Sequence, residues 1–544
     1  MSVHVVVDGR VFDTEAADRG MGRYVLHLVE LLVASQTAVT VLLPNIAVQR
    51  RWPGHARAEY VNFEDDPTAG TVTLNRALER LGATLYVDAT PFLAPQRYDV
   101  YACPVLAVLY DLIPMRYPRD YFASFGPGAL DPYINGLARV KKADHVIAIS
   151  QHVKGLALRY LGVARDRCSV IEPSVAEAYR RYPPPERAAV AADAPMLCIQ
   201  GAHRSKNFPR AIGFLERLAE AAGCAIDVVV PTLTQRRLVE EARDPGAASL
   251  RVAHSIPEER KFALQANARA IAHLSLEEGY GIPLAEALYL YRPIVCLDIA
   301  VNRELTGDPD EALAAGVLLL ANPTLASDDD LRDAASFVRD GPVADFVAAR
   351  RKVIERLLAR HDAAGRELAS AIDAAHARFA ARSGHKSLAI AAPTEIGSCG
   401  VSDYCHALMR SPEPRFVLLL GAAPRAMQVL PQLRLVPIAL ADEVRKRSRG
   451  VLLNLAVSDS LARGFDAIAE GSTVDDVLIV HDAGSYAPGL LMQANAHGDA
   501  RLLWSRYLAD EAESVKALSR RWLVAPGADA HALFLELDRQ YRSV

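Results

Sequence analysis

The chain has 544 residues, of which 51% are hydrophobic and 23% are charged. This composition excludes extensive disorder, and the length predicts roughly three or four domains at about 150 residues each. Lys and Arg together number 61 and Asp and Glu 65, so the formal net charge is −4. Such a balance argues against a protein built mainly to bind nucleic acid, and no nucleic-acid partner is expected.

The cysteines and the N-terminus indicate a reducing, cytoplasmic location. The seven cysteines are scattered, and no two have the Cys-x-x-Cys spacing of a zinc ribbon or a thioredoxin motif. The opening MSVHVVVDGR enters a strand pattern directly, without the charged and apolar regions of a signal peptide. The longest apolar runs, such as 416–423, are shorter than the ~18 residues of a spanning helix, so any membrane contact is expected to be peripheral.

Short β-branched runs alternate with amphipathic segments. Predicted strands cover residues 3–8, 38–44, 105–111, 145–150, 196–201, 225–231, 268–275 and 293–298, and the first helix covers 22–35. Strands separated by helical stretches predict an α/β fold of parallel sheets with helices on both faces. Ligands of such sheets bind at the carboxyl ends of the strands, so the site is expected there.

Two stretches divide the chain into lobes. Residues 172–194 concentrate proline and charge, and SGHKS at 383–387 follows a long Ala- and Arg-rich helical stretch at about 343–382. The predicted units are a first lobe over residues 1–180, a second lobe over residues 181–382 and a third region over residues 383–544.

Loops of the first predicted lobe carry candidate residues. GMGRY at 20–24 lies between a strand and a helix, and Gly22 is the candidate site residue of this loop. The dinucleotide-binding Gly-x-Gly-x-x-Gly pattern is absent because Val25 occupies its last position. Asp111 follows a strand, where it either caps the following turn or positions a substrate hydroxyl. Ser150 is expected to cap a helix start, with or without a further role in the cleft.

The first candidate segment of the second lobe is a basic loop. Residues 197–218 predict a strand, a tight turn and a helix that begins near Pro209. Arg204 and Lys206 precede that helix, so two cations are expected beside its free N–H groups, where they attract an anion. Solvated surface cations are the alternative interpretation.

The most informative segment is SLEEGYGIPLAEALYLYRPIVCLD at 275–298. Gly279 and Gly281 would let the backbone approach a ligand, and Pro283 suits the first turn of a helix. A helix N-terminus binds a diphosphate without needing a metal. Glu278 and Glu286 flank this anion site, which favours carboxylates that accept hydrogen bonds from sugar or ribose hydroxyls.

The segment E-G-Y-G-I-P-L-A-E closely resembles the E-x7-E motif of glycosyltransferase family 4, a large class of retaining transferases with the GT-B fold. Three further segments are similar to family segments: LYDLIP at 109–114, ADHVIAIS at 143–150 (the family's AD-x-I-I-x-I-S) and the Lys206-Asn207 pair. The resemblance therefore covers about residues 1–380. It implies two Rossmann-like lobes with parallel sheets, an active site between them, retention of anomeric configuration and no obligatory metal or cofactor.

The resemblance also implies roles. The donor-binding set is Gly22, Arg204, Lys206, Glu278, Gly279, Tyr280, Gly281, Ile282, Pro283 and Glu286, and the catalytic set is Asp111, Arg204, Lys206 and Glu278. Glu286 would contact the ribose of the donor and Glu278 the transferred sugar and diphosphate, which Arg204 and Lys206 would neutralise. Tyr110 replaces the histidine usual in the family, which argues against a mechanism with an imidazole at that position.

The third region repeats the opening of the first lobe. LAIAAP is followed by a loop with Gly397 and Gly400 and then by Tyr404, and VLIVHDAGSY at 477–486 parallels VLAVLYDLIP at 105–114. No copy of E-G-Y-G-I-P-L-A-E follows residue 383. A partial glycosyltransferase-like lobe without a donor site is therefore predicted, a smaller α/β region that packs on the transferase or recruits an acceptor, membrane or partner.

The function implied is the transfer of a hexose, mannose or similar, from GDP-mannose or a UDP-hexose to a glycan or lipid-linked oligosaccharide. The setting would be bacterial surface polysaccharide biosynthesis (lipopolysaccharide O-antigen, capsule or exopolysaccharide), in the cytoplasm or peripherally at the inner face of the inner membrane. A nucleotide-sugar epimerase or phosphorylase and a non-catalytic assembly subunit remain alternatives. Basic residues on the 343–382 helix predict a solvated face or, alternatively, a surface for anionic lipid: Arg350, Arg351, Lys352, Arg356 and Arg360.

Overall fold

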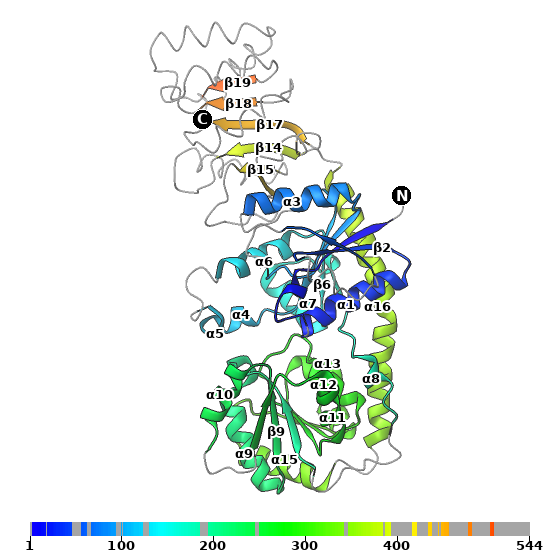
Figure 1. Cartoon of the computed structure of the whole chain (residues 1–544), viewed down its shortest axis with the longest axis vertical. Coiled ribbons are helices and arrows are strands. Elements are labelled where there is room, and N and C mark those ends of the chain that lie inside the picture. The colour runs from blue at the N-terminus through cyan, green and yellow to red at the C-terminus, as the bar shows by residue number, and fades with distance from the viewer. Residues whose placement is uncertain are drawn as a thin grey trace.

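A computed structural model of the chain contains three sheets, each built of parallel strands (Figure 1). The structure describes residues 3–17, 19–45, 56–62, 67–93, 100, 102–122, 130–184, 194–244, 250–341 and 346–383 and, beyond these, residues 387–392, 416–420, 434–437, 444, 448–455, 477–480 and 501–504. Among the helices within these ranges, none is both long and apolar enough to cross a bilayer.

The first sheet forms lobe one and has the strand order β3-β2-β1-β4-β5-β6-β7. Its strands are β1 (His4–Asp8), β2 (Ala38–Leu43), β3 (Arg57–Tyr60), β4 (Leu85–Asp88), β5 (Val105–Leu109), β6 (His145–Ala148) and β7 (Cys168–Val170). Its helical segments are η1 (Arg10–Asp13), α1 (Gly20–Ala34), α3 (Pro67–Arg80), α4 (Ile113–Arg116), α5 (Pro118–Phe122), α6 (Leu130–Lys142), α7 (Gln151–Leu156), η3 (Ala157–Leu161) and η4 (Arg165–Arg167). The central strands are buried along almost their whole length because helices cover both faces of the sheet.

The second sheet forms lobe two, with the order β10-β9-β8-β11-β12-β13. Its strands are β8 (Met196–Ile199), β9 (Ile226–Val230), β10 (Leu250–His254), β11 (Ile271–His273), β12 (Ile294–Leu297) and β13 (Val317–Leu320). The short helix α8 (Glu177–Arg180) precedes β8. The helical segments that follow are η5 (Arg204–Lys206), α9 (Arg210–Ala222), α10 (Leu233–Ala242), α11 (Glu258–Asn267), α12 (Ile282–Tyr289), α13 (Ala300–Thr306), α14 (Pro309–Ala314) and α15 (Asp328–Asp340). Two Rossmann-like lobes of parallel strands confirm the predicted α/β, GT-B fold class.

One long helix, α16 (Phe346–Ser383), joins the two lobes. It begins against lobe two, where it contacts α12 and α14, and continues along lobe one, where it contacts α1, β5, β6 and β7 (Figure 1). Near its end Arg378 pairs with Asp166 of lobe one at 2.6 Å. The helix therefore belongs to the packing of both lobes, although its sequence follows the second.

The prediction that the basic residues of this helix form a solvated face is wrong for Arg350, whose side chain is fully buried. Its guanidinium donates to four carbonyl groups: Leu288 at 3.3 Å, Arg292 at 3.2 Å, Ala315 at 2.5 Å and Gly316 at 3.0 Å. These carbonyls lie at or just beyond the ends of α12 and α14, where helices leave acceptors unsatisfied and carry partial negative charge. Arg350 thus ties the start of α16 to lobe two.

The third sheet has the order β16-β15-β14-β17-β18-β19. Its strands are β14 (Ser387–Ala392), β15 (Phe416–Leu420), β16 (Arg434–Pro437), β17 (Ser448–Leu455), β18 (Val477–Val480) and β19 (Arg501–Trp504). In chain order this is the arrangement of the first six strands of lobe one, and β18 takes the place of β5, as the similarity of 477–486 to 105–114 predicts. Lobe two has the same order, so topology alone does not single out lobe one as the template. The predicted loop with Gly397, Gly400 and Tyr404 lies outside the described residues.

Candidate functional site

The candidate site lies at the carboxyl edge of the second sheet, where the strand order reverses. β8 and β11 pair there, although β9 and β10 separate them in the sequence. β8 leads into η5, and β11 leads into the loop that precedes α12. In doubly wound sheets ligands bind at such a switch point, because the two connections depart to opposite faces of the sheet.

Backbone hydrogen bonds join these two loops. The carbonyl group of Ser205 accepts from the N–H of Leu276 at 2.8 Å and from the N–H of Glu277 at 3.2 Å. On the other side of η5, the Asn207 side chain donates to the carbonyl group of Pro323 at 2.9 Å. The turn is therefore fixed beside the segment that carries Glu278.

Lys206 and Glu278 form an ion pair in which Nζ lies 2.5 Å from Oε1. Their side chains are only 24% and 11% exposed. Burial opposes ionisation of Glu278, but the charge and the hydrogen bond of Lys206 outweigh it and lower the pKa of this carboxyl group. The structure thus brings together two predicted site residues, and the lysine is held by a carboxylate rather than by solvent.

His273, the last residue of β11, was not among the candidates drawn from the sequence. Its Nε2 lies 3.4 Å from the Glu278 oxygen that pairs with Lys206. The ring is 2% exposed, and neither of its nitrogens has a hydrogen-bond partner within the described part of the chain. A histidine that ends a short apolar strand has no sequence signature that separates it from a core histidine.

Two glycines are sterically required in the loop before α12. A Cβ on Gly279 would lie 2.3 Å from the carbonyl oxygen of Tyr110 in lobe one, well inside contact distance. Gly281 has φ +87° and precedes the first residue of α12, a left-handed conformation that suits glycine. Pro283 occupies the first turn of the helix, where its missing N–H is not needed.

Asp111 follows β5 and reaches the same region from lobe one. Its Oδ1 accepts from the N–H of Ile113 at 2.9 Å, so it caps the following turn. Burial is the main cause that raises the pKa of Asp111 to about 6, with a smaller contribution from the charges of Glu278 and Glu277 and opposition from Lys206. The carboxyl group therefore shares an electrostatic environment with the Lys206–Glu278 pair.

Glu286 is fully buried on α12 and lies in a separate cluster of charges. Its Oε1 accepts from Arg23 of lobe one at 3.0 Å and from Lys261 at 2.9 Å, and its Oε2 accepts from Gln265 at 3.3 Å. Glu258 also pairs with both cations. The predicted ribose contact is thus engaged by protein groups, one of which comes from the opposite lobe.

The other predicted residues take various places. Arg204 is exposed on η5. Gly22 lies in the first turn of α1, where a Cβ would be 1.9 Å from the Ala17 carbonyl oxygen. Ile282 is half-buried, and its Cδ1 would be 3.3 Å from a Cβ on Gly20. The hydroxyl group of the buried Tyr280 donates to Glu172 at 3.3 Å, and Glu172 also pairs with Arg360 of α16 at 2.9 Å.

Polar contacts close the two lobes around the loop. Ser150 accepts from Val153 N–H at 3.1 Å as the cap of α7 and donates to the carbonyl group of Gly279 at 2.6 Å. Glu304 of lobe two accepts from the first two N–H groups of α7, at 2.7 and 2.9 Å. Glu277 pairs with Arg116 and lies 3.4 Å from His152, both in lobe one. The predicted cap at Ser150 is confirmed, and its further role in the cleft stays a prediction.

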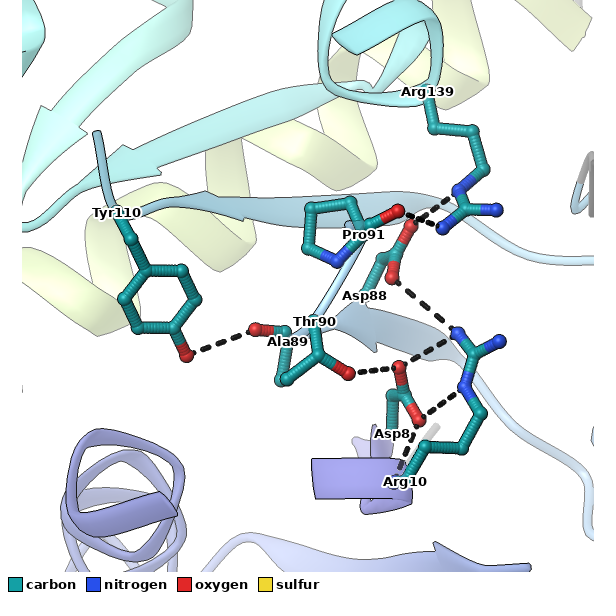
Figure 2. Close-up of polar contacts among 8 residues, drawn as sticks. All are labelled: Asp8, Arg10, Asp88, Ala89, Thr90, Pro91, Tyr110 and Arg139. Atoms are coloured by element: carbon teal, nitrogen blue, oxygen red, sulfur yellow. Dashed lines mark hydrogen bonds and ion pairs between the residues drawn. The ribbon is translucent and has the colours of Figure 1, made fainter. Parts of the chain in front are cut away.

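Tyr110 is a structural residue of lobe one. Its hydroxyl group donates to the carbonyl group of Ala89 at 2.9 Å, just past β4 (Figure 2). Beside it Asp8 accepts from Arg10 at 2.8 Å and from Thr90 at 2.8 Å. These contacts, with the Asp88–Arg139 pair at 3.0 Å, fix the ends of β1 and β4. The Tyr110 side chain therefore supports the lobe.

Sequence reasoning identified Glu278, Lys206 and the glycines because loop and helix-start patterns are local. It missed Lys261, Glu304, Glu277 and His273. The lobe-one partners of Glu304 and Glu277 are distant in the sequence, whereas His273 lies close in sequence to Glu278, and Lys261 to Glu258. Glu277 alone carried a signal, as the neighbour of Glu278 in an acidic pair. Within the described ranges, no three His, Cys, Asp or Glu side chains gather where they could hold a metal ion.

No family model matches the sequence, and no curated protein matches it. Among solved structures, the chain is similar to a glycosyltransferase from Rickettsia africae at 12% identity, with a TM-score of 0.49 over 69% of this chain and 98% of that one. It is also similar to WaaG, a glycosyltransferase involved in lipopolysaccharide biosynthesis (13% identity, TM-score 0.43, 65% of this chain and 99% of that one). A third similar structure is trehalose-6-phosphate from E. coli bound with UDP-2-fluoro glucose (12% identity, TM-score 0.46, 68% of this chain and 99% of that one). At these identities the chemistry of the present chain depends on its own side chains.

Proposed function

We propose that the chain is a glycosyltransferase that uses a nucleoside diphosphate sugar. The observation that carries this proposal is the Lys206–Glu278 ion pair at the switch point of lobe two, with Asp111 of lobe one in the same electrostatic environment. A cation, a carboxylate and a helix N-terminus in one crevice suit a diphosphate that carries a hydroxylated sugar.

In this proposal Lys206 and the N-terminal turn of α12 bind the diphosphate, and Arg204 adds a second cation from the exposed side of η5. Their positive charge stabilises the negative charge that develops on the diphosphate as it leaves. Glu278 accepts hydrogen bonds from hydroxyl groups of the transferred sugar. Glu286 accepts hydrogen bonds from the ribose hydroxyl groups, which replace some of its present hydrogen bonds to protein groups.

The proposed reaction retains the anomeric configuration. The bond between the anomeric carbon and the diphosphate oxygen breaks, and the acceptor hydroxyl oxygen bonds to that carbon on the same face. The hydroxyl proton passes to an oxygen of the departing diphosphate, which balances the charge. Asp111 positions the acceptor hydroxyl group by accepting its hydrogen bond while ionised.

The finer identity of the substrates follows the family 4 resemblance. We propose a hexose such as mannose, donated by GDP-mannose or a UDP-hexose, and a glycan or lipid-linked acceptor of surface polysaccharide biosynthesis. The same resemblance favours a cytoplasmic enzyme with peripheral contact at the membrane.

A panel of UDP- and GDP-sugars tests the proposal, first by thermal shift and then by the mass of the product formed with added acceptors. The expected result is stabilisation by one donor and an acceptor-dependent product. Lys206→Ala should lower turnover about a hundredfold, the scale of a lost charge stabiliser. Arg210→Ala, an exposed cation at the start of α9, is the matched control and should be near normal.

The outcomes separate this proposal from its alternatives. Conversion of the donor without any acceptor would favour an epimerase or a phosphorylase. Donor binding without turnover on any acceptor would favour a non-catalytic subunit. Normal kinetics of a folded Lys206→Ala protein would remove Lys206 from the site.

A further inference from the structure

His273 is a buried histidine with unused hydrogen-bonding capacity. It lies at the carboxyl end of β11, 2% exposed, and both ring nitrogens are without a hydrogen bond to any described residue. Burying a polar group without a partner is costly, and such groups in folded proteins call for an explanation. Its Nε2 lies 3.4 Å from a carboxylate oxygen of Glu278, a residue of the candidate site.

This ring lies near the Glu278 oxygen that Lys206 also contacts. The distance from His273 Nε2 to Glu278 Oε1 is 3.4 Å, whereas Lys206 Nζ lies at 2.5 Å from the same oxygen. Gly281 does not crowd the same nitrogen, since even an added Cβ there would lie 3.8 Å from Nε2. Burial lowers the pKa of His273, so the ring is neutral and carries a single N–H.

Lys206 has two competing tasks. In the structure it neutralises Glu278, yet a donor diphosphate would draw the same ammonium group away. Glu278 is largely buried, and a buried carboxylate that loses its partner is strongly destabilised. A further hydrogen bond to Glu278 would therefore favour donor binding, in addition to the contribution of the Ser275 side chain.

We infer that His273 is a positioning residue that holds Glu278 when Lys206 turns to the donor diphosphate. This inference rests on the proposed function. With its proton on Nε2, the neutral ring moves a few tenths of an ångström closer and donates to Oε1 without any proton transfer. Glu278 stays ionised and oriented toward the sugar hydroxyls, and the release of Lys206 costs less.

The test is a double-mutant cycle between His273 and Lys206, with binding of UDP or GDP measured by calorimetry, whichever the wild-type protein binds. His273→Ala should weaken this binding about tenfold, because Lys206 is then retained by Glu278. In a Lys206→Ala protein, His273→Ala should have no further effect on binding. Glu278→Gln frees Lys206, so it should bind the bare nucleotide at least as tightly as the wild type while turnover falls.

Rescue separates positioning from packing. His273→Gln places an amide N–H near the position of Nε2 and should restore most of the nucleotide affinity and kcat. His27→Gln is the matched control, since His27 is also buried and its Nε2 has no partner among the described residues, but it lies in α1 of lobe one. This control should leave nucleotide binding unchanged.

Several outcomes would overturn the inference. One is equal loss of affinity from His273→Ala in the wild-type and Lys206→Ala backgrounds, which means that the ring acts through packing. Another is full activity of a folded His273→Ala protein. A wild-type protein that neither binds nor turns over any nucleotide sugar would instead refute the proposed function, before His273 is considered. His273→Gln, which keeps a buried polar side chain, still decides the question if the alanine variant fails to fold.

Discussion

Arg23 of lobe one lies 3.0 Å from Glu286 of lobe two, measured from Nη1 to Oε1. Lys261 approaches the same oxygen at 2.9 Å, and the Glu286 side chain has no solvent exposure. A ribose can therefore reach Glu286 only if some of these hydrogen bonds are exchanged for hydroxyl groups. Arg23 is the most readily exchanged partner, because it is 27% exposed and belongs to the other lobe.

We predict that Glu286→Gln weakens binding of the bare nucleoside diphosphate and of the intact donor alike, by about 1–3 kcal/mol, the scale of a charge-assisted hydrogen bond. Calorimetry with both ligands measures this. Glu304→Gln is the control: it removes an interlobe carboxylate that caps α7 outside the donor site, and should change nucleotide affinity less than twofold (about 0.4 kcal/mol). If only the sugar-bearing donor were affected, the roles of Glu286 and Glu278 would be exchanged.

A second prediction concerns the close approach of the lobes at Gly279. Gly279→Ala would place a Cβ 2.3 Å from the Tyr110 carbonyl oxygen, so loop and strand end must separate. We expect a lower melting temperature, a loss of about 1–3 kcal/mol and weaker donor binding. Gly365→Ala in α16 meets nothing within 4 Å among the described residues and should instead stabilise the protein by about 0.5–1 kcal/mol. Equal melting temperatures for the two variants would contradict this close approach of the lobes.

A third prediction concerns pH. Burial raises the pKa of Asp111 from 3.8 to about 6, and the free enzyme needs the ionised form to accept a hydrogen bond. The profile of kcat/KM should therefore fall on the acid side with an apparent pKa of about 6. Asp111→Asn should lower the rate about a hundredfold and abolish this limb, whereas Asp340→Asn, at an exposed position, should keep it.

The raised pKa of Asp111 also determines how this residue makes the free energy of unfolding depend on pH. The folded protein holds the Asp111 proton more tightly than the unfolded chain does. This contribution to the free energy of unfolding is therefore complete below pH 3.8 and is lost as the pH rises through about 6. Denaturant unfolding of the wild-type and Asp111→Asn proteins between these values measures it; a wild-type curve that gains stability relative to Asp111→Asn as the pH rises would contradict the assignment.

The fourth prediction uses two adjacent arginines. Arg350→Ala removes a donor from four buried carbonyl groups, of which, among the described residues, only those of Leu288 and Gly316 keep a backbone N–H partner, and it opens a cavity, so we expect a loss of about 2–5 kcal/mol. Arg351→Ala, one residue further along α16, removes an exposed side chain and should change stability by less than about 0.5 kcal/mol. Chemical denaturation measures both, and similar values for the two would show that Arg350 is not held as described.

Most central strands of the first two sheets could be predicted from the sequence because they are apolar on both faces. β1, β5 and β12 are largely hydrophobic runs, which is the pattern of a sheet covered on both sides. In these two sheets β3, β4, β7, β10 and β13 escaped prediction. β3 and β10 lie at sheet edges, and their RAEY and LRVAH sequences are largely half-exposed and charged, as edge strands often are. β4, β7 and β13 are short, so their sequences carry little periodic pattern.

Part of the candidate site could likewise be predicted from the sequence, and part could not. Glycine, proline and helix-start patterns located the loop before α12 and the turn at Lys206, since these depend on neighbouring residues. The pairing of Arg23 with Glu286 spans 263 positions and depends on how the lobes dock, which no local pattern encodes. Arg350 was predicted to be solvated because it belongs to a row of basic residues. That row of charges does not reveal that carbonyl groups at helix ends surround this one side chain.

The fifth prediction concerns the third sheet. Its edge strand β16 contacts α3 of lobe one, on the far side of lobe one from lobe two (Figure 1). All the candidate donor-binding residues lie between positions 22 and 286, and the E-G-Y-G-I-P-L-A-E segment has no second copy after residue 383. A protein that ends at Ser383, the last residue of α16, should therefore bind the nucleoside diphosphate within about twofold of the full chain.

Activity of this shortened protein on a simple soluble acceptor should be at least partly preserved, because α16 still spans both lobes. The truncation uncovers the part of α3 that contacts β16, and the melting temperature of the shortened protein shows whether this contact matters for folding. A folded protein that does not bind the donor would contradict the prediction. Residues 384–544 expressed alone should bind no nucleotide sugar, since the sequence supplies neither a basic strand–turn–helix like 197–218 nor the paired glutamates. Binding of a nucleotide sugar by that fragment in the micromolar range would show that the third region carries a donor site of its own.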